Sequence, residues 1–168
     1  MKLSYVLFQT RLGWMGVLGT PRGLCRLALP QSSPQAVRHL LGDRLGGAQP
    51  DAALFGDLAH RLKGYLEGEK AAFDDRLDLT AASPFQRGVW QATRRIPYGH
   101  TRSYAWIARE IGKPRAARAV GRALAANPLP ILIPCHRVIA GDGSLGGYAG
   151  GCGVKGFLLG MEASAIGG

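Results

Sequence analysis

A change of pattern near residue 80 divides the 168-residue chain into two parts, and this division limits what the chain can fold into. Before it, three short apolar runs separated by turn residues indicate an antiparallel meander. The runs cover residues 3–10, 13–19 and 23–29. Two stretches with helical spacing of apolar residues follow, one after Ser33-Pro34 and one from about Asp51. Residues 1–80 are therefore predicted to form a small α/β domain, and residues 74–82 a linker.

The second part, residues 83–168, is predicted to be mainly α-helical. Ser83-Pro84-Phe85-Gln86 has the pattern of a capping box with proline at the first helical position, so a helix should start there. A shorter helix is expected from Ser103 to Gly112, and the next from Pro114 to about Ala126. Two helices joined by a tight turn that contains glycine are typical of a helix-turn-helix.

Charge is unevenly distributed between the two parts. The whole chain has 21 Lys and Arg against 11 Asp and Glu, a net charge of +10. Residues 1–82 hold 10 basic and 8 acidic side chains, whereas residues 83–168 hold 11 and 3, so the net charges are +2 and +8. Such an excess attracts polyanions, so we expect the second part to carry the surface that contacts a partner.

Several classes of protein are excluded by the same sequence. No apolar run is long enough to span a bilayer, and Gln9 and Arg11 interrupt any signal-peptide core, so a cytoplasmic protein with no membrane partner is expected. Three widely spaced cysteines imply no disulfide framework. The spacing of Cys25, His39 and His60 matches no closed zinc site, so no metal and no cofactor are expected. Cys25 is interpreted as a small buried strand residue.

The predicted helix from residue 114 to residue 126 has a basic face. At about 100° per residue, Arg115, Arg118 and Arg122 share one face, and the other side chains on that face are small. No Asn or Gln on the face could read adenine in a major groove, so contacts to phosphates in a narrow groove are favoured. The alternative is a solvated arginine face, but the charge of this part favours nucleic acid.

A proline-rich segment leads to the residues that could carry chemistry. Residues 126–134 contain three prolines and are otherwise apolar, which favours an extended chain that ends at Cys135-His136-Arg137. A lone cysteine is most often a small buried residue, but here an adjoining base and cation both favour the nucleophilic thiolate. His136 would reach the sulfur through a water, and a carboxylate should orient its imidazole. The candidates in this part are Glu110, Asp142 and Glu162.

A glycine-rich stretch, residues 141–151, follows the cysteine and contains one aromatic residue, Tyr148. It is interpreted either as a flexible turn or as a lid whose backbone amides and Tyr148 wall a pocket. It has no Gly-Lys-Ser/Thr, which excludes a phosphate-binding loop. A final helix is predicted over residues 154–161, with Glu162 at its end.

These residues together resemble the O6-alkylguanine-DNA alkyltransferase family, and the resemblance covers nearly all of residues 83–168. The matching segments are Ile96-Pro97-Tyr98-Gly99, Ser103-Tyr104, Ala117-Arg118-Ala119-Val120-Gly121, Asn127-Pro128, Ile133-Pro134-Cys135-His136-Arg137-Val138, Gly147-Tyr148, Gly150-Gly151, Lys155, Leu158-Leu159 and Glu162. Residues 1–80 match the family only in length and in layout. The resemblance implies a ribonuclease-H-like α/β domain followed by a winged helix-turn-helix domain. It also implies repair of double-stranded DNA, which the protein would bind from the minor groove and from which it would flip out O6-alkylguanine.

The resemblance assigns a role to each matching residue. Cys135 would be the nucleophile and keep the alkyl group, His136 would be its base, and Glu162 would hold His136. Tyr104 would donate a proton or hydrogen bond to the guanine ring, Asn127 would brace the loop that carries the cysteine, and Arg118 would occupy the gap left by the flipped base. Residues expected to line the pocket are Pro130, Val138, Tyr148 and Ala149. Residues expected to contact phosphates from the basic face and its turn are Lys113, Arg115 and Arg122.

The sequence departs from the family pattern at two positions, and three alternative functions remain to be considered. Ala149 stands where many members have Ser, and Lys113 replaces the usual Asn before Pro114. The alternatives are a damage sensor that does not react, a plain helix-turn-helix regulator and a thiol hydrolase. A sensor of that kind carries another residue in place of Cys135, which argues against it. The expected protein is a monomer, with O4-alkylthymine as a further substrate and cooperative binding to DNA both left open.

Overall fold

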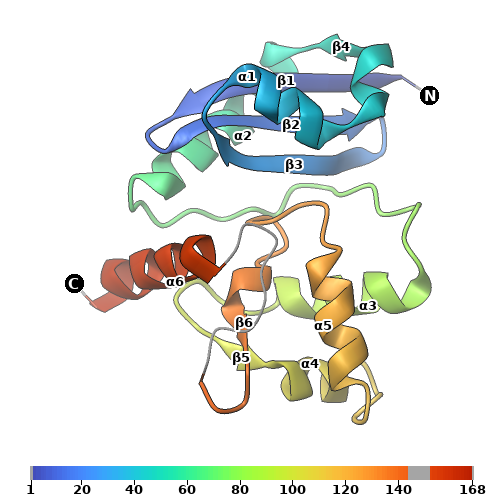
Figure 1. Ribbon diagram of the computed structural model, residues 1–168, viewed down its shortest axis with the longest axis vertical. Helices are drawn as coiled ribbons and strands as arrows, with labels where there is room; N and C mark the ends of the chain where they lie inside the picture. The colour runs from blue at the N-terminus through green and yellow to red at the C-terminus, as the bar shows by residue number, and fades with distance from the viewer. Residues whose placement is uncertain (1, 144–151, 168) are drawn as a thin grey trace. The chain divides into compact units, whose positions relative to one another are not determined.

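The structure is a computed structural model that describes residues 2–143 and 152–167. The chain forms two compact units, Met1–Leu79 and Thr80–Gly168 (Figure 1). None of the helices in the described part of the chain is both long and apolar enough to cross a membrane.

The first unit is built on a four-stranded mixed sheet. Strands β1 (Leu3–Thr10), β2 (Gly13–Thr20) and β3 (Gly23–Gln31) form the predicted antiparallel meander, which is confirmed. A fourth strand, β4 (Ala48–Pro50), pairs in parallel with β1, so the order is β3-β2-β1-β4. Strand β4 was not predicted, because Ala-Gln-Pro is too short and too polar to show a strand pattern.

Two helices cover opposite faces of this sheet (Figure 1). Helix α1 (Pro34–Leu41) and the 3-10 turn η1 (Asp43–Gly47) pack on one face, and α2 (Ala52–Leu66) packs on the other. Two glycines of β2 let the helices lie close to the sheet, one on each face. A Cβ on Gly16 would meet Val37 of α1, and one on Gly19 would meet Phe55 of α2. The α1 face forms a core cluster of Leu18, Ala28, Val37, Leu41 and Leu45.

Two details of the first unit differ from the sequence analysis. Leu40 fits the helical spacing of apolar residues after Pro34, which predicts that it is buried with Val37 and Leu41, but it is 45% exposed. It lies about 100° around the helix from Leu41, and an eight-residue helix has room for only a narrow buried stripe. Cys25 is half-buried rather than buried, and its thiol contacts the carbonyl of Leu18 at 3.4 Å.

The second unit is mainly helical, as predicted. It contains α3 (Pro84–Arg94), α4 (Tyr104–Glu110), α5 (Ala117–Ala125) and α6 (Cys152–Gly167). Both helix starts predicted from serine are confirmed: Ser83 forms the full capping box with Gln86, and Ser103 accepts a hydrogen bond from the Trp106 amide. Helices α3 and α4 both pack against α5, and the Trp90 indole donates to the Ala123 carbonyl (2.9 Å).

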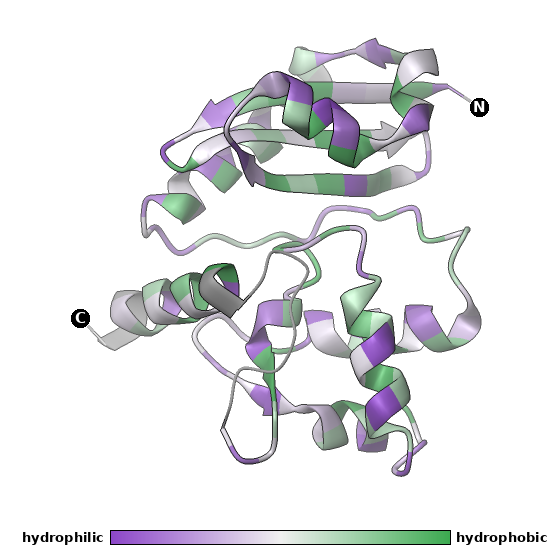
Figure 2. Cartoon of the chain, in the orientation of Figure 1, coloured by the Kyte–Doolittle hydropathy of each residue, from purple (hydrophilic) through white to green (hydrophobic). Residues whose placement is uncertain are grey.

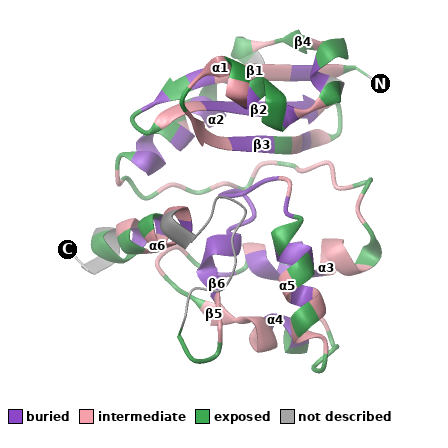
Figure 3. Cartoon of the chain, in the orientation of Figure 1, coloured by how far each residue is buried: buried purple, intermediate pink, exposed green. Residues whose placement is uncertain are grey.

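A two-residue ladder connects distant parts of this unit. Strand β5 (Arg102–Ser103) pairs in parallel with β6 (Val138–Ile139), directly before α4 and directly after the short 3-10 turn η2 (Cys135–Arg137). The backbone from Leu129 to Val138 is buried throughout (Figure 3). The segment that carries Cys135 is therefore part of the core of the unit.

The predicted start of the basic helix is wrong by three residues. Helix α5 begins at Ala117 rather than at Pro114, so Arg115 lies in the preceding turn. That turn is closed by a hydrogen bond from the Ala116 amide to the Lys113 carbonyl, and Ala116 has no side chain that could cap the helix. Pro114 therefore lies in the turn rather than at the start of the helix.

A paired substitution tests the close approach between the β2–β3 turn and the segment after α2. Gly23 has a φ of +146°, and a Cβ there would lie 2.6 Å from the Arg76 carbonyl oxygen. We expect Gly23→Ala to lower the free energy of unfolding by more than about 1 kcal/mol in urea titrations followed by circular dichroism.

Gly56→Ala is the matched control for this experiment. Gly56 lies inside α2, and a Cβ there would meet nothing within 4 Å. The same change should therefore raise the free energy of unfolding by about 0.5–1 kcal/mol. Equal changes in the free energy of unfolding for the two substitutions would show that a side chain at residue 23 does not strain the turn.

Candidate active site

The backbone that presents Cys135 is tightly folded. Its prolines prevent a regular helix. A hydrogen bond from the Ile133 amide to the Leu129 carbonyl (2.8 Å) closes a turn instead. Within this turn Ile131 has a φ of +77°, a strained conformation for a β-branched residue. The Ile131 side chain is 3% exposed, so its burial offsets the strain. The Cys135 amide then bonds to the Ile133 carbonyl (2.7 Å), and η2 begins.

Asn127 connects the start of this turn to the cysteine. Its Nδ2 donates to the Ile133 carbonyl (2.9 Å) and to Sγ of Cys135 (3.1 Å), and its Oδ1 accepts from the Leu129 amide (2.8 Å). Both Asn127 and Cys135 are buried. A hydrogen bond donated to sulfur stabilises the thiolate more than the thiol, so Asn127 favours the nucleophilic form.

His136 and Glu162 are in direct contact. Nε2 of His136 lies 2.7 Å from Oε2 of Glu162, and both side chains are at most 1% exposed. Because an ionised carboxylate only accepts hydrogen bonds, Nε2 is the protonated ring nitrogen and Nδ1 is the one that can accept a proton. Of the three carboxylates considered from sequence, Glu162 is the one brought to the imidazole, whereas Glu110 and Asp142 are exposed.

Arg137 is bound to the same carboxylate. Its Nε donates to Oε1 of Glu162 (2.8 Å) and its Nη2 to Oε2 (2.9 Å), while its Nη1 donates to the Ile96 carbonyl (2.9 Å). The amide of Gly99 donates to Oε1 as well (3.1 Å). Proximity to Cys135 in the sequence predicts Arg137 to be a cation that favours the thiolate; in the structure its charge is instead compensated by Glu162. Adjacency in sequence suggested the first arrangement, whereas the bonding partner lies 25 residues away.

The buried charges shift two pKa values. Burial lowers the pKa of His136 below its ordinary value; Glu162 opposes this, and Arg137 and Lys155 add to it. The resting imidazole is therefore neutral. Burial raises the pKa of Tyr98, whose ring lies 5.6 Å from the guanidinium carbon of Arg137.

Lys155 was missed as a functional residue, although it was among the residues of the resemblance. It is fully buried on α6, its Nζ donates to the Val138 carbonyl (2.6 Å), and it lies 5.8 Å from the centre of the Tyr104 ring. A lysine is almost never fully buried without a partner. Its sequence signal is a positive charge within the otherwise apolar first turns of the last helix.

The basic residues predicted to contact DNA are all exposed. Arg118 and Arg122 lie one turn apart on α5, where Figure 2 shows hydrophilic residues along one face of the helix. Lys113 and Arg115 are exposed in the turn before it. A Cβ on Gly121 would lie 3.9 Å from the Tyr104 ring, so a small residue lets α5 pack close to Tyr104.

The predicted pocket residues divide into two groups. Pro130 and Val138 are buried in the segment that surrounds Cys135, and Val138 pairs with Arg102 of β5. Tyr148 and Ala149 lie outside the described residues.

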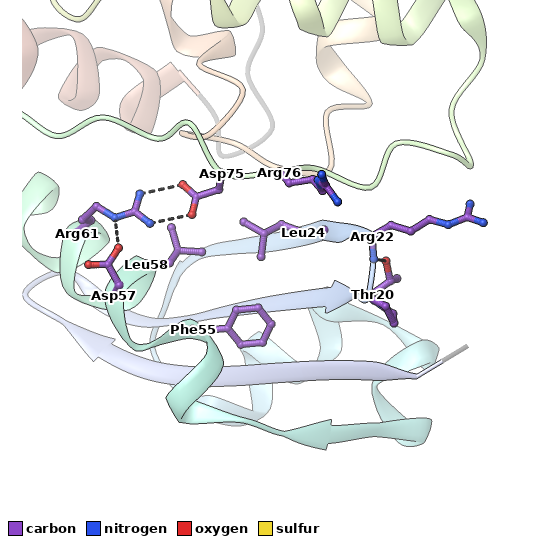
Figure 4. A pocket seen from close by; sticks show the side chains of 11 residues that line it. Thr20, Arg22, Leu24, Phe55, Asp57, Leu58, Arg61, Asp75 and Arg76 are labelled. Atoms are coloured by element: carbon purple, nitrogen blue, oxygen red, sulfur yellow. Dashed lines mark hydrogen bonds and ion pairs between the residues drawn. The ribbon is translucent and has the colours of Figure 1, made fainter.

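A separate hollow of about 350 Å³ lies on the first unit, between the β2–β3 turn, α2 and the segment around Asp75 (Figure 4). Arg61 lies at one end of it, in hydrogen bonds to both oxygens of Asp75 and in an ion pair with Asp57. No residue predicted for the site lines this hollow. Within residues 2–143 and 152–167, no three His, Cys, Asp or Glu side chains are grouped so that they could hold a metal ion.

The chain matches known proteins in sequence over both of its parts. Residues 3–79 match the family model "6-O-methylguanine DNA methyltransferase, ribonuclease-like domain", and residues 84–164 match "6-O-methylguanine DNA methyltransferase, DNA binding domain". A methylated-DNA–protein-cysteine methyltransferase of Methanosarcina acetivorans is 47% identical over 110 residues, which cover 66% of this chain and 70% of that protein. One of Mycobacterium tuberculosis is 50% identical over 115 residues, which cover 68% and 69%.

Solved structures are similar over almost the whole chain. The crystal structure of Mycobacterium tuberculosis OGT in complex with DNA has a TM-score of 0.80 and 40% identity, and it covers 96% of this chain and 94% of that one. The O6-methylguanine-DNA methyltransferase of Pyrococcus kodakaraensis has a TM-score of 0.69 and 28% identity, with 95% and 98% covered. The resemblance drawn from the motifs is thus confirmed over both parts of the sequence, and the chain belongs to the 6-O-methylguanine DNA methyltransferase family.

Proposed function

We propose that Cys135 of this chain receives the alkyl group from O6 of guanine in damaged DNA, and that each molecule reacts once. The observation that supports this assignment best is one set of buried contacts. The Asn127 amide bonds to Sγ of Cys135, and the imidazole of the next residue bonds to Glu162. A buried cysteine without a role would need neither the donor nor the oriented base.

Cys135, His136 and Tyr104 supply every proton transfer that the proposed alkyl transfer needs. Nδ1 of His136 takes the thiol proton through a water, and the sulfur electron pair forms a bond to the alkyl carbon as the carbon–O6 bond breaks. The electron pair of the broken bond leaves with guanine, which takes a proton at its ring from the Tyr104 hydroxyl. Tyr104 recovers, by way of solvent, the proton that His136 received. One proton therefore passes from thiol to guanine, and the alkyl group stays as a thioether.

Lys155 supports Tyr104 in this scheme. Its buried ammonium lies 5.8 Å from the centre of the Tyr104 ring and is held by the Val138 carbonyl. A positive charge there stabilises negative charge that develops on the phenolic oxygen or on the base.

The basic surface supplies the DNA contact. Arg118 and Arg122 on α5, with Lys113 and Arg115 before it, would neutralise phosphates without reading sequence. The alkyl carbon of O6-alkylguanine cannot reach a buried sulfur while the base is stacked, so the base must leave the helix. We propose that Arg118 fills the gap it leaves, and that Pro130, Val138, Tyr148 and Ala149 surround the flipped base.

The covalent step is tested by intact-protein mass spectrometry after mixing with duplex DNA that contains one O6-methylguanine. We expect a gain of one methyl group that maps to the Cys135 peptide. Cys135→Ser should abolish it, because a serine hydroxyl is not ionised at neutral pH, and Cys25→Ser should leave it unchanged. Binding to the lesion without a mass change would instead identify a damage sensor that does not react.

Asn127→Ala tests the donor to sulfur. A hydrogen bond to a charged group contributes about 1.5–3 kcal/mol, so the single-turnover rate at neutral pH should fall at least about tenfold. The pH at which iodoacetamide begins to react with Cys135 should rise, because the thiolate has lost a donor. Gln91→Ala, an exposed change on α3, is the matched control. An unchanged pH profile would show that Asn127 only shapes the turn.

Arg118→Ala tests the role of the gap-filling arginine. We expect the methyl-transfer rate from duplex DNA to fall while the rate from the free base O6-methylguanine stays the same, because a free base does not need to be flipped. Arg95→Ala, an exposed arginine at the end of α3, should change neither rate. Equal losses on both substrates would place Arg118 in the chemistry or in folding instead.

A further inference from the structure

Glu162 is held by two cation-forming side chains at once. Its two oxygens accept hydrogen bonds from His136 Nε2, from the Gly99 amide, and from Nε and Nη2 of Arg137, at 2.7–3.1 Å. Arg137 makes the planar two-point contact that suits a carboxylate best. The Coulomb attraction of Glu162 is therefore shared between a guanidinium that is always charged and an imidazole that can become charged.

We propose that Arg137 is a positioning residue that compensates the charge of Glu162, so that His136 is oriented by the carboxylate but stays neutral until Cys135 releases its proton. This inference rests on the proposed function, in which His136 must accept a proton. It adds a role for Arg137, which would act through Glu162 and not by contact with the sulfur or with the flipped guanine.

The geometry distinguishes this arrangement from an uncompensated His–carboxylate pair. A buried carboxylate with no other cation would bind a proton on the imidazole strongly, and a protonated His136 could not act as a base. Here the bidentate contact with Arg137 balances the carboxylate, while the Nε2 bond still fixes the ring and its tautomer. Arg137 is held in turn by the Ile96 carbonyl and the Tyr98 ring, so it cannot easily swing away.

The other charged groups around His136 act in the same direction. Lys155 on α6 disfavours a second positive charge, and burial does the same. Tyr98 faces Glu162 and Arg137, and Cys135 adjoins the imidazole in η2. Glu162 is the group in this cluster that favours a protonated imidazole, so the proton affinity of His136 should depend on how much of its charge Arg137 compensates.

The test is a titration of the histidine ring signals by NMR in the full chain, with Arg137→Gln and Arg137→Lys compared with the parent. Gln keeps a hydrogen-bond donor but removes the charge, whereas Lys keeps the charge and loses the fork geometry. We expect the parent His136 to titrate below about 6.5, the ordinary pKa of histidine. In Arg137→Gln the pKa of His136 should rise by about one unit or more, and in Arg137→Lys it should stay near the parent value.

Two results would overturn the inference. One is a folded Arg137→Gln protein whose His136 titrates as in the parent, and the other is the same shift in Arg137→Gln and Arg137→Lys. If Arg137→Gln does not fold, a shift in Arg137→Lys as large as one unit would also overturn it. Arg87→Met, which removes an arginine whose Nη1 donates to the Ala82 carbonyl, is the matched control and should leave the pKa of His136 unchanged.

The mass measurement on the parent keeps this inference separate from the proposed function. If Cys135 gains no methyl group, the proposed function fails whatever the titration shows. If it gains the methyl group and the titration does not respond to charge at position 137, only the role of Arg137 fails.

Discussion

The buried carboxylate of Glu162 joins the segments that build the site in the second unit, and their arrangement depends on its hydrogen bonds. It comes from α6 and binds the backbone of Gly99 after α3, as well as two consecutive side chains of η2. Removing one partner of such a pair leaves an uncompensated charge in a low-dielectric core, which is why buried ion pairs are so sensitive to substitution. The same carboxylate thus holds three segments together and, in the proposed reaction, orients the His136 base. Folding and chemistry therefore cannot vary independently at this position.

The site combines reactivity with burial. Cys135 is 4% exposed, yet the groups around it favour the thiolate and offer a base. In the proposed reaction, enclosure protects a nucleophile that reacts once from other electrophiles in solution, and it requires that the substrate be brought to the sulfur. The exposed arginines of α5 and the small residues between them fit that requirement, since they let a helix lie close to a phosphate backbone.

Local patterns in the sequence were enough to predict much of this fold. Strands β1 to β3, the capping box at Ser83 and the cap at Ser103 follow from short-range periodicity and turn chemistry. Features set by distant contacts were not accessible in this way. Strand β4 exists because β1 offers an edge, and α5 starts late because a turn closes on Lys113. The second part has three carboxylates, so composition alone limits the partner of His136 to three candidates. That Glu162 binds Arg137 as well as His136 follows only from the three-dimensional contacts.

The ladder between β5 and β6 has a consequence for how this unit can change over evolution. It joins Arg102 to Val138 and Ser103 to Ile139, which places the start of α4, and with it Tyr104, in fixed backbone register with the residues that follow Cys135. The turn before α5 and the proline-rich segment lie between the two strands in sequence but outside their register. Insertions and deletions in the exposed turn before α5 can therefore accumulate without changing the spacing of tyrosine and cysteine, whereas the buried proline-rich segment, which Asn127 holds, cannot take them. One added residue within either two-residue strand would shift that spacing by a whole step, about 3.3 Å.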